Sequence, residues 1–421
     1  MNLKATSQPL FPETAEVEGG ELTVGGVRTS ELAAEFGTPL VVYCERTILD
    51  AARAYREAAP HALPLYSLKA FPNVELLRLL AAEGFGADVS TLGELEFARR
   101  AGIAGERIVV HGNNKSDQEL RAAAEADVRF VVLDALDEPE RAAAAGVRRA
   151  LVRVTPGIEA DTHEKIRTAH HGSKFGLPPD DALRAAAAGR KAGLEVAGVH
   201  LHIGSQLVDL RAGLETIDWL KEFAARDWLP EVVDLGGGLG IAYVEGERPP
   251  SVREFVASLL ERLADGWPGE LPQLILEPGR SLVGTAGLTL YRVGVVKQAS
   301  DDVTYVAVDG GMSDNPRPQL YGARYSALLA NRAAEPAERV FDVCGKHCES
   351  GDVLIEGVLL PEPRRGDLLA VPATGAYTLS MGSNYNAVPR PAAVLVADGH
   401  ARLIRSRETL DDLLRQEQGS G

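Results

Sequence analysis

Short apolar runs alternate with stretches of helical period from about residue 63 to residue 280. The apolar runs are LPLYSLKA (63–70), GFGADVS (84–90), RIVVHG (107–112), RFVVLD (129–134), RALVRVTP (149–156), EVAGVHLHIG (195–204), EVVDLGGGLG (231–240) and QLILEPGR (273–280). Amphipathic stretches separate them, at 73–83, 91–101, 116–126, 136–145, 180–192, 210–225 and 251–264, and Ser116 is the expected N-cap of one predicted helix.

Continuous apolar strands separated by helices indicate parallel pairing with both faces of the sheet covered. Eight such strands over about 220 residues predict an α/β fold, a closed (β/α)8 barrel of the TIM type. The alternative is an open, doubly wound sheet. We favour the barrel because the alternation is uninterrupted and no dinucleotide-binding fingerprint opens it.

The pattern changes after residue 285, where short turns separate the apolar runs. These runs are 288–298, 303–310, 338–345, 352–360, 367–375 and 392–405, and Ala-Asp-Gly-His within the last predicts a hairpin. Short strands at this spacing predict a mainly antiparallel β-barrel or sandwich. We expect ELTVGGVRT (21–29) to add a strand to this sheet, and we assign PLVVYCE (39–45) to the connection into the barrel. The predicted domains are 38–285 for the barrel, and 1–37 with 286–421 for the β domain.

Composition and charge narrow the class of protein. The 421 residues are 45% hydrophobic and 25% charged, which is an ordinary globular balance. A net charge of −16 argues against a nucleic-acid partner, and an anionic substrate would need a local basic patch. Three cysteines, Cys44, Cys344 and Cys348, are too few for a disulfide framework. Neither a signal peptide nor a membrane span is expected, so we expect a cytoplasmic protein without a membrane partner.

The carboxyl ends of barrel strands are where such folds place their active sites. Lys69 follows the first strand and is either a candidate for a Schiff base in a desolvated mouth or a lysine that reaches the surface. Glu277 ends the eighth apolar strand, so its carboxylate needs a cationic or N–H partner. That partner is either Arg280, in a structural salt bridge, or a protonated heteroaromatic nitrogen of a ligand, which leaves Arg280 for a phosphate or carboxylate.

The sixth strand ends with His200 and His202, which share one face because they lie two residues apart. One interpretation is a metal site completed by other strand-end carboxylates, for which the candidates are Asp88, Asp134 and Asp234. The other is a pair of packed core histidines.

Glycines and a serine at two neighbouring strand ends suit a phosphate. Gly204-Ser205 follows the histidines, and Gly236-Gly237-Gly238 closes the seventh strand, where backbone N–H groups can approach a ligand closely. A Schiff-base lysine, an imidazole able to stack on a ring, this cradle and a carboxylate for a pyridine nitrogen are together what pyridoxal 5′-phosphate requires. The metal interpretation explains neither the glycines nor Glu277-Pro278-Gly279-Arg280, so no metal is predicted.

The chain resembles the fold-type III pyridoxal-phosphate-dependent decarboxylases from about residue 38 to residue 405. The matching stretches are YSLKAF, SKFG (173–176), HLHIGSQ, DLGGGLG, EPGR, RPQLYGA (317–323), CES (348–350) and GAYTLSMGSNYN (375–386). The resemblance implies an alanine-racemase-like barrel followed by a β domain, with pyridoxal phosphate as the cofactor. It also implies a homodimer in which Cys348 and Glu349 reach the active site of the neighbouring subunit.

Site roles follow from the same resemblance. Lys69 would form the Schiff base, His202 would stack on the cofactor ring, Glu277 would face the pyridine nitrogen, and Cys348 would donate the proton. The implied cofactor-binding residues are Lys69, Asp88, His202, Ser205, Gly236, Gly237, Gly238, Glu277, Gly279, Arg280 and Tyr377. The implied substrate-binding residues are Arg280, Arg317, Tyr321, Glu349 and Tyr377.

The implied reaction is decarboxylation of meso-2,6-diaminopimelate to L-lysine and CO2, the last step of lysine biosynthesis. Arginines suit the distal carboxylate of that substrate, and Glu349 suits its distal amine. The alternatives are a related decarboxylase for another amino acid with a distal carboxylate, and a non-catalytic relative that binds the cofactor.

One segment departs from the family pattern, which usually has Gly-Pro and an apolar residue before Cys-Glu-Ser. Here Cys344-Gly345-Lys346-His347 precedes Cys348. A proton donor must hold its thiol proton, whereas a neighbouring lysine and histidine favour the thiolate. Cys344, His347 and Cys348 could also belong to a zinc site, which the lack of a fourth ligand nearby disfavours.

Overall fold

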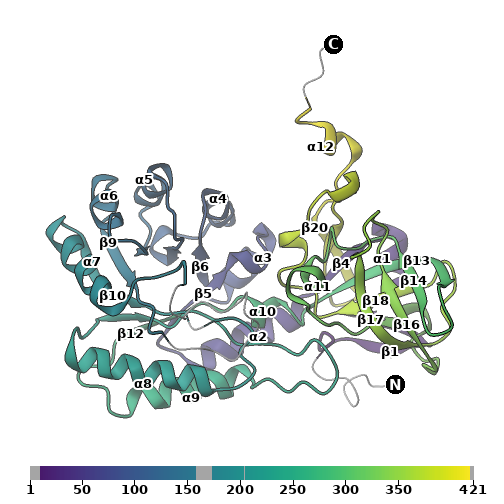
Figure 1. Ribbon diagram of the computed structural model, residues 1–421, viewed down its shortest axis with the longest axis horizontal. Helices are drawn as coiled ribbons and strands as arrows, with labels where there is room; N and C mark the ends of the chain where they lie inside the picture. The colour runs from purple at the N-terminus through teal and green to yellow at the C-terminus, as the bar shows by residue number, and fades with distance from the viewer. Residues whose placement is uncertain (1–9, 158–172, 203, 418–421) are drawn as a thin grey trace. The chain divides into compact units, whose positions relative to one another are not determined.

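Eight parallel strands close into a barrel in the computed structural model, in the order β10-β11-β12-β5-β6-β7-β8-β9 (Figure 1). The strands are β5 (Leu63–Ser67), β6 (Gly86–Val89), β7 (Ile108–Val110), β8 (Phe130–Leu133), β9 (Arg149–Arg153), β10 (Glu195–His200), β11 (Val232–Asp234) and β12 (Gln273–Leu276). The predicted barrel is therefore confirmed, and each strand falls within its predicted apolar run. The structure describes residues 10–157, 173–202 and 204–417.

The interior of the barrel is filled by apolar side chains from seven of its strands. These are Leu65, Val109, Phe130, Val132, Leu151, Ala197, Val232 and Ile275, all largely excluded from solvent. Alternate residues of each strand point inward, so the continuous apolar runs serve both this interior and the helices outside.

Helices surround the strands, as Figure 1 shows. They are α3 (Val74–Ala82), α4 (Leu92–Ala101), α5 (Asp117–Glu125), α6 (Glu138–Ala144), α7 (Pro179–Lys191), α8 (Arg211–Arg226) and α9 (Val252–Ala264). The N-cap expected at Ser116 is present. Its hydroxyl accepts the N–H of Glu119 while the Glu119 carboxylate accepts the N–H of Ser116, so α5 begins with a complete capping box.

A second unit contains a nine-stranded, mainly antiparallel sheet. Its strands are β4 (Leu40–Cys44), β13 (Gly287–Gln298), β14 (Thr304–Val308), β15 (Leu328–Leu329), β16 (Arg339–Cys344), β17 (Val353–Leu360), β18 (Leu368–Pro372), β19 (Ala392–Ala397) and β20 (His400–Arg405). The long strand β13 pairs with β4 and β18 through its first half and with β14 through its second. The predicted hairpin joins β19 to β20 through Asp398 and Gly399, which both have positive φ.

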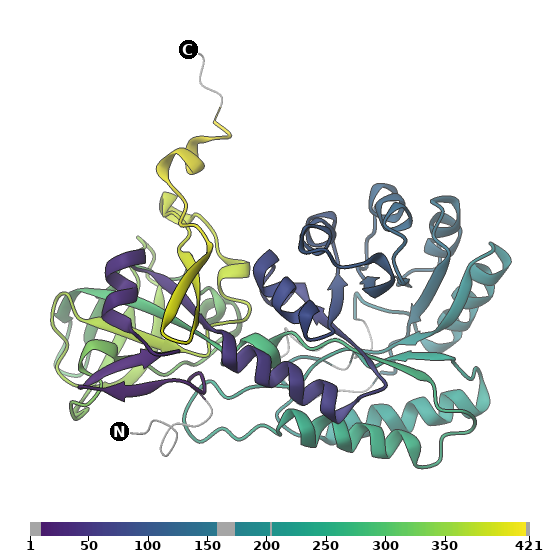
Figure 2. The ribbon, with the colours of Figure 1, turned by 180° about the vertical axis from the view of Figure 1, so that it is seen from behind.

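Two predictions about the N-terminal part of the chain were wrong. Residues 39–45 form β4, which pairs with β13 and β19 inside the second sheet instead of leading into the barrel. The segment 21–29 does not join that sheet. It forms a separate three-stranded sheet of β1 (Glu16–Glu18), β2 (Glu21–Val24) and β3 (Val27–Arg28), and helix α1 (Thr29–Phe36) follows β3 and contacts β2 and β3. These N-terminal elements are drawn in dark purple in Figure 2.

Apolar packing is the physical reason for both differences. Leu22 and Val24 share a core with Leu40, Val42 and residues of β13 and β19. The N-terminal sheet is therefore attached to the nine-stranded sheet by side-chain packing, and among the described residues no strand of one sheet pairs with a strand of the other.

The division into two units differs from the predicted domains. The second unit comprises Met1–Ile48, Ile241–Arg248 and Leu282–Gly421, and the barrel unit comprises Leu49–Gly240 and Pro249–Ser281. The boundaries therefore differ from the predicted ones at 38–48, 241–248 and 282–285. Within 241–248, Ile241 and Tyr243 pack against the second sheet.

Within the described residues, no helix combines the length and the apolar character needed to cross a membrane. Residues 158–172, which include most of the loop expected at 157–178, lie outside the described residues.

Candidate active site

The carboxyl ends of the barrel strands gather the residues that the sequence places there. Lys69 lies in a 3-10 turn (Leu68–Ala70) directly after β5, and its side chain is exposed. Asp88, near the end of β6, accepts a hydrogen bond from the Ser67 hydroxyl. Burial raises the pKa of Asp88 and the charge of Glu277 adds to this, whereas His111 and Lys69 lower it. Lys69 therefore lies within electrostatic reach of Asp88.

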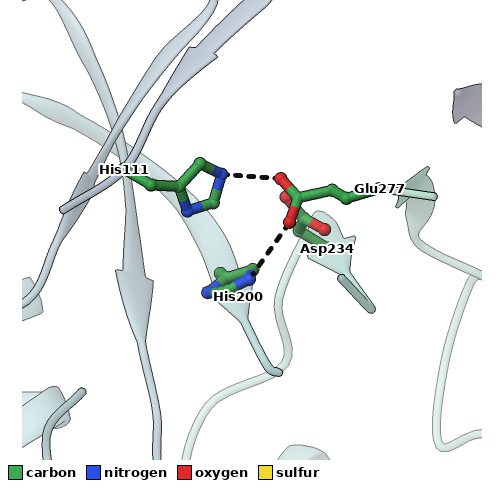
Figure 3. Close-up of side chains that lie close together, drawn as sticks. All are labelled: His111, His200, Asp234 and Glu277. Carbon is green, nitrogen blue, oxygen red and sulfur yellow. Dashed lines mark ion pairs between the residues drawn. The ribbon is translucent and has the colours of Figure 1, made fainter. Parts of the chain in front are cut away.

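Four buried side chains converge beneath the mouth of the barrel, as Figure 3 shows. They are His111, His200, Asp234 and Glu277, and one ligand-type atom of each lies within 4.8 Å of the others. Glu277 occupies the middle of the group. Its Oε1 lies 2.6 Å from His111 Nε2, and its Oε2 lies 3.5 Å from His200 Nε2.

The protonation states of this group follow from burial and proximity. Burial alone would raise the pKa of Glu277, but the charge of His111 and hydrogen bonding by His111 and His200 hold it well below its usual range. Burial would lower the pKa of His111, but Glu277 and Asp88 raise it. Burial lowers the pKa of His200 to about 3. Glu277 is therefore an anion paired with a protonated His111, beside a neutral His200.

Asp234 differs from Glu277 although the two carboxyl groups are neighbours. Burial raises the pKa of Asp234 well above its usual range, and the adjacent charge of Glu277 adds to that effect. Its Oδ1 accepts the N–H of Gly236 at 2.8 Å. Two carboxyl groups so close cannot both ionise cheaply, so Glu277 carries the charge and Asp234 keeps its proton.

His202 differs from its neighbour His200 in its contacts. The two rings are nearly parallel, with centroids 6.4 Å apart, and it is His200 that contacts Glu277. Desolvation lowers the pKa of His202 well below its usual range, and the charges of Lys69 and Arg153 add to this. The result is a neutral, flat imidazole, which suits stacking on an aromatic ring.

The glycine cradle has no space for side chains. A Cβ at Gly236 would lie 2.7 Å from His202 Nδ1, and one at Gly237 would lie 2.4 Å from the Glu277 carbonyl oxygen. Gly238 has φ +114°, and a Cβ there would lie 2.9 Å from the Gly204 carbonyl oxygen. These close contacts require glycine at all three positions, and because the Gly236 N–H is bonded to Asp234, the N–H groups that could approach a phosphate are those of Gly237 and Gly238.

Arg280 lies beside this cradle. Its guanidinium donates a hydrogen bond to the Ser205 hydroxyl at 2.9 Å. The salt bridge to Arg280 was one interpretation of Glu277, but His111 and His200 are the residues that hold this carboxylate. The cradle, the neutral His202 and the Glu277 anion fit the requirements of pyridoxal phosphate, whose phosphate Ser205, Arg280 and the glycines would hold.

Three residues of this site were not singled out from the sequence: His111, Arg153 and Phe175. His111 follows β7 and Arg153 ends β9, so the same inspection of strand ends, applied to the third and fifth strands, could have found them. The Arg153 guanidinium lies 4.6 Å from the Phe175 ring centroid and 3.8 Å from Asp134 Oδ2. Asp134 also accepts the N–H of Gly176, so it orders the SKFG segment instead of facing His200.

The remaining predicted residues belong to the β unit. Helix α11 (Arg317–Tyr321) carries Arg317, whose guanidinium lies 4.3 Å from the Tyr243 ring centroid and 5.6 Å from that of Tyr325. Arg317 donates a hydrogen bond to the Tyr325 hydroxyl, and its Nε is buried without a hydrogen-bond partner. In the described part of the chain, this buried guanidinium has no carboxylate partner.

Cys348 and Glu349 lie on the loop between β16 and β17. The Cys348 side chain is exposed, and its N–H donates to Asn386 Oδ1 at 2.9 Å. The Tyr385 hydroxyl donates to Glu349 Oε2 at 3.2 Å. The segment containing Tyr377 and Tyr385, which follows β18, therefore contacts the Cys348 loop inside this unit.

Comparison with known proteins defines the class to which this fold and site belong. The model of the family described as "Pyridoxal-dependent decarboxylase, pyridoxal binding domain" matches residues 45–284. Diaminopimelate decarboxylase of Actinosynnema pretiosum is 45% identical, with 97% of this chain and 95% of that protein covered. The Bacillus subtilis enzyme of the same name is 41% identical, with 94% and 95% covered.

Solved structures agree with the sequences. The crystal structure of diaminopimelate decarboxylase from M. jannaschii in complex with L-lysine has a TM-score of 0.91 and 34% identity, covering 97% of this chain and 99% of that chain. The protein is thus a pyridoxal-phosphate-dependent decarboxylase with an alanine-racemase-like barrel. Within that class, the chain belongs to the diaminopimelate decarboxylase family.

Proposed function

We propose that the protein removes CO2 from meso-2,6-diaminopimelate to give L-lysine, with distinct roles for groups at the barrel mouth and on the β unit. When bound, pyridoxal phosphate supplies an electron sink for the electron pair that the departing carboxylate leaves behind. Glu277, kept anionic by His111, would hold a proton at the pyridine nitrogen. His202 would stack on the ring, and Lys69 would supply the amine that attaches the cofactor.

The environment of Arg317 is the observation that supports the substrate assignment. A buried guanidinium without a carboxylate partner in the described residues, flanked by Tyr243 and Tyr325, is suited to an anionic group brought by a ligand. An amino acid with a distal carboxylate supplies that anion, whereas an amino acid whose distal group is only an amine, such as ornithine or lysine, does not. Tyr321 and Tyr377 would contact the same substrate, and Glu349 would bind its distal amine.

Protonation of the α-carbon completes the reaction. Cys348 would donate this proton, which requires that its thiol remain protonated until the carbanion equivalent forms. The recombinant protein should release equal amounts of CO2 and L-lysine from meso-diaminopimelate. Release of CO2 from ornithine or lysine, with none from diaminopimelate, would contradict the substrate assignment. A protein that binds the cofactor and turns over neither substrate would support the non-catalytic alternative.

We also propose a homodimer in which Cys348 and Glu349 of one subunit complete the site of the other. Lys69→Ala and Cys348→Ala proteins should each be nearly inactive alone. After subunit exchange, the mixture should recover about a quarter of wild-type activity, because half the dimers are mixed and each has one intact site. Exchange of labelled subunits without recovered activity would contradict shared sites and leave the substrate assignment untouched.

A further inference from the structure

A second cleft opens in the barrel unit, at the ends of the strands opposite the site just described. It has a volume of about 450 Å³ and lies where β5 and β12 begin, at Leu63 and Gln273. Arg107 and Arg129 come directly before β7 and β8, so both guanidinium groups belong to this end of the barrel. Since catalysis belongs to the other end, decarboxylation does not use this cleft.

The lining of this cleft is basic. Arg56, Arg107 and Arg129 line it together with His61, and no Asp or Glu is among the described lining residues. Pro60, Leu63 and neighbouring apolar groups form the rest of its wall. A cleft lined by three arginines and a histidine is unusual on a chain whose net charge is −16, because acidic side chains outnumber basic ones and most arginines have one nearby.

The arginines have poor charge compensation inside the described part of the chain. Arg107 donates to the Gly84 carbonyl, and Arg129 donates to Gln273 Oε1 at 2.9 Å, but neither has an ion pair there. Arg129 Nε is buried without a hydrogen-bond partner. Burial lowers the pKa of Arg129, the like charges of Arg149 and Arg107 lower it further, and the charge of Glu106 opposes this only in part. Arg56 shares Glu83 with Arg53, at 3.6 and 3.1 Å.

We propose that this cleft is a binding site for a small phosphorylated compound. Guanidinium groups bind phosphate oxygens in a bidentate manner, and three of them lie around one concave surface. The volume exceeds that of a phosphate ion and falls in the range of sites for small organic ligands. The apolar wall at Pro60 and Leu63 would contact the organic part of the ligand.

Titration calorimetry of the cofactor-loaded enzyme with inorganic pyrophosphate tests the site, because bound cofactor already occupies the phosphate cradle at the other end. We expect saturable binding at low ionic strength that weakens as salt rises. Arg129→Met should weaken it at least tenfold. Arg56→Gln, on the exposed face of helix α2 (Glu45–Ala58), should weaken it several-fold without disturbing the barrel.

The matched control is Arg226→Met, which removes an exposed arginine paired with Asp227 on α8 and should bind pyrophosphate like the wild type. Absence of saturable binding to the wild-type protein would overturn the proposal. So would equal binding by the wild type and by both cleft variants. Neither outcome depends on decarboxylase activity.

Discussion

His111 Nε2 and Glu277 Oε1 lie 2.6 Å apart in the interior of the barrel mouth, and both side chains are more than nine-tenths buried. An isolated carboxylate at such a depth would take up a proton. The protonated imidazole prevents this and makes Glu277 a permanent anion at neutral pH. A permanent anion is what stabilises a protonated nitrogen on a bound pyridine ring.

Glu277→Gln should therefore reduce kcat by about 100-fold or more, since a preorganised charge at the reacting system is lost. The visible spectrum of the bound cofactor should also change. His111→Phe should have a smaller effect on kcat but should raise the pKa of Glu277, so the acidic limb of the pH–rate profile moves to higher pH. A pH profile of His111→Phe that matches the wild type would contradict the pairing.

The barrel was predictable because its information is local. Each of the eight apolar runs predicts its own strand, each of the seven amphipathic stretches predicts its own helix, and Ser116 indicates where α5 begins. The errors concern β4 and the strand at 21–29, where the pattern identifies a strand but not its partner. Pairing is decided by packing between distant segments, such as those of Leu22 and Val42, which share one core, and the periodicity of a single segment does not contain this information.

The site was predictable in part for a related reason. Strand ends converge in a closed barrel, so position alone brings Glu277, His202 and the glycines together. It does not tell which neighbour pairs with which. Arg280 was a reasonable partner for Glu277 from the sequence, but His111, more than 160 residues away, takes that place. The pairing also explains why the His-x-His motif need not indicate a metal.

Arg317 should govern the affinity for the substrate more than the rate of the chemical step. Arg317→Met would leave the distal carboxylate without its partner, at a cost of about 1.5–3 kcal/mol. We expect KM for diaminopimelate to rise roughly ten- to a hundredfold, with a smaller change in kcat. Arg292→Met removes an exposed arginine of the same unit and is the matched control. An unchanged KM in Arg317→Met would rule out this role.

Chelation should leave the enzyme active, although Glu277 and three other potential metal ligands lie close together. Metal binding requires deprotonated histidines, whereas Glu277 keeps a proton on His111. Dialysis against EDTA should not change activity. Removal of the cofactor with hydroxylamine should abolish it, and added pyridoxal phosphate should restore it. Loss of activity in EDTA, reversed by a divalent metal, would contradict the assigned protonation of this cluster.

Glu408 should make part of the stability of the β unit depend on pH. Its carboxylate accepts hydrogen bonds from the Arg390 Nε and N–H and from Asn384, at 2.6–2.8 Å. Burial alone would raise the pKa of Glu408, but these partners lower it from 4.5 to about 2. The stabilisation is thus complete above pH 4.5 and is lost as the pH falls through about 2.

Glu408→Gln should therefore lower the free energy of unfolding by about 1 kcal/mol at neutral pH, the range of partly screened pairs. The difference from the wild type should shrink as the pH falls below 4.5. Thermal unfolding followed across this pH range checks the expectation, with the exposed Glu417→Gln as the control. A difference that is constant with pH would show that the carboxylate charge is not responsible.

His347 should control the mobility of the Cys348 loop, because it directly precedes Cys348 and is held by two hydrogen bonds. Its buried Nε2 shares a hydrogen bond with the Ser313 hydroxyl at 2.9 Å, and its N–H donates to Asp352 Oδ2 at the same distance. The side chain thus connects the loop to the segment after β14. Loss of the hydrogen bond between His347 and Ser313 should let the Cys348 side chain move, while the bond from the His347 N–H to Asp352 still holds the backbone.

His347→Phe and Ser313→Ala should therefore lower kcat, by about three- to tenfold if one hydrogen bond of about 1 kcal/mol is lost, with little change in KM. Alkylation of Cys348 by iodoacetamide, measured by mass spectrometry in the same samples, should become faster in both variants. Cys344 provides an internal reference, since its thiol lies outside this contact. If kcat falls while Cys348 reacts at the wild-type rate, His347 does not act by positioning the loop.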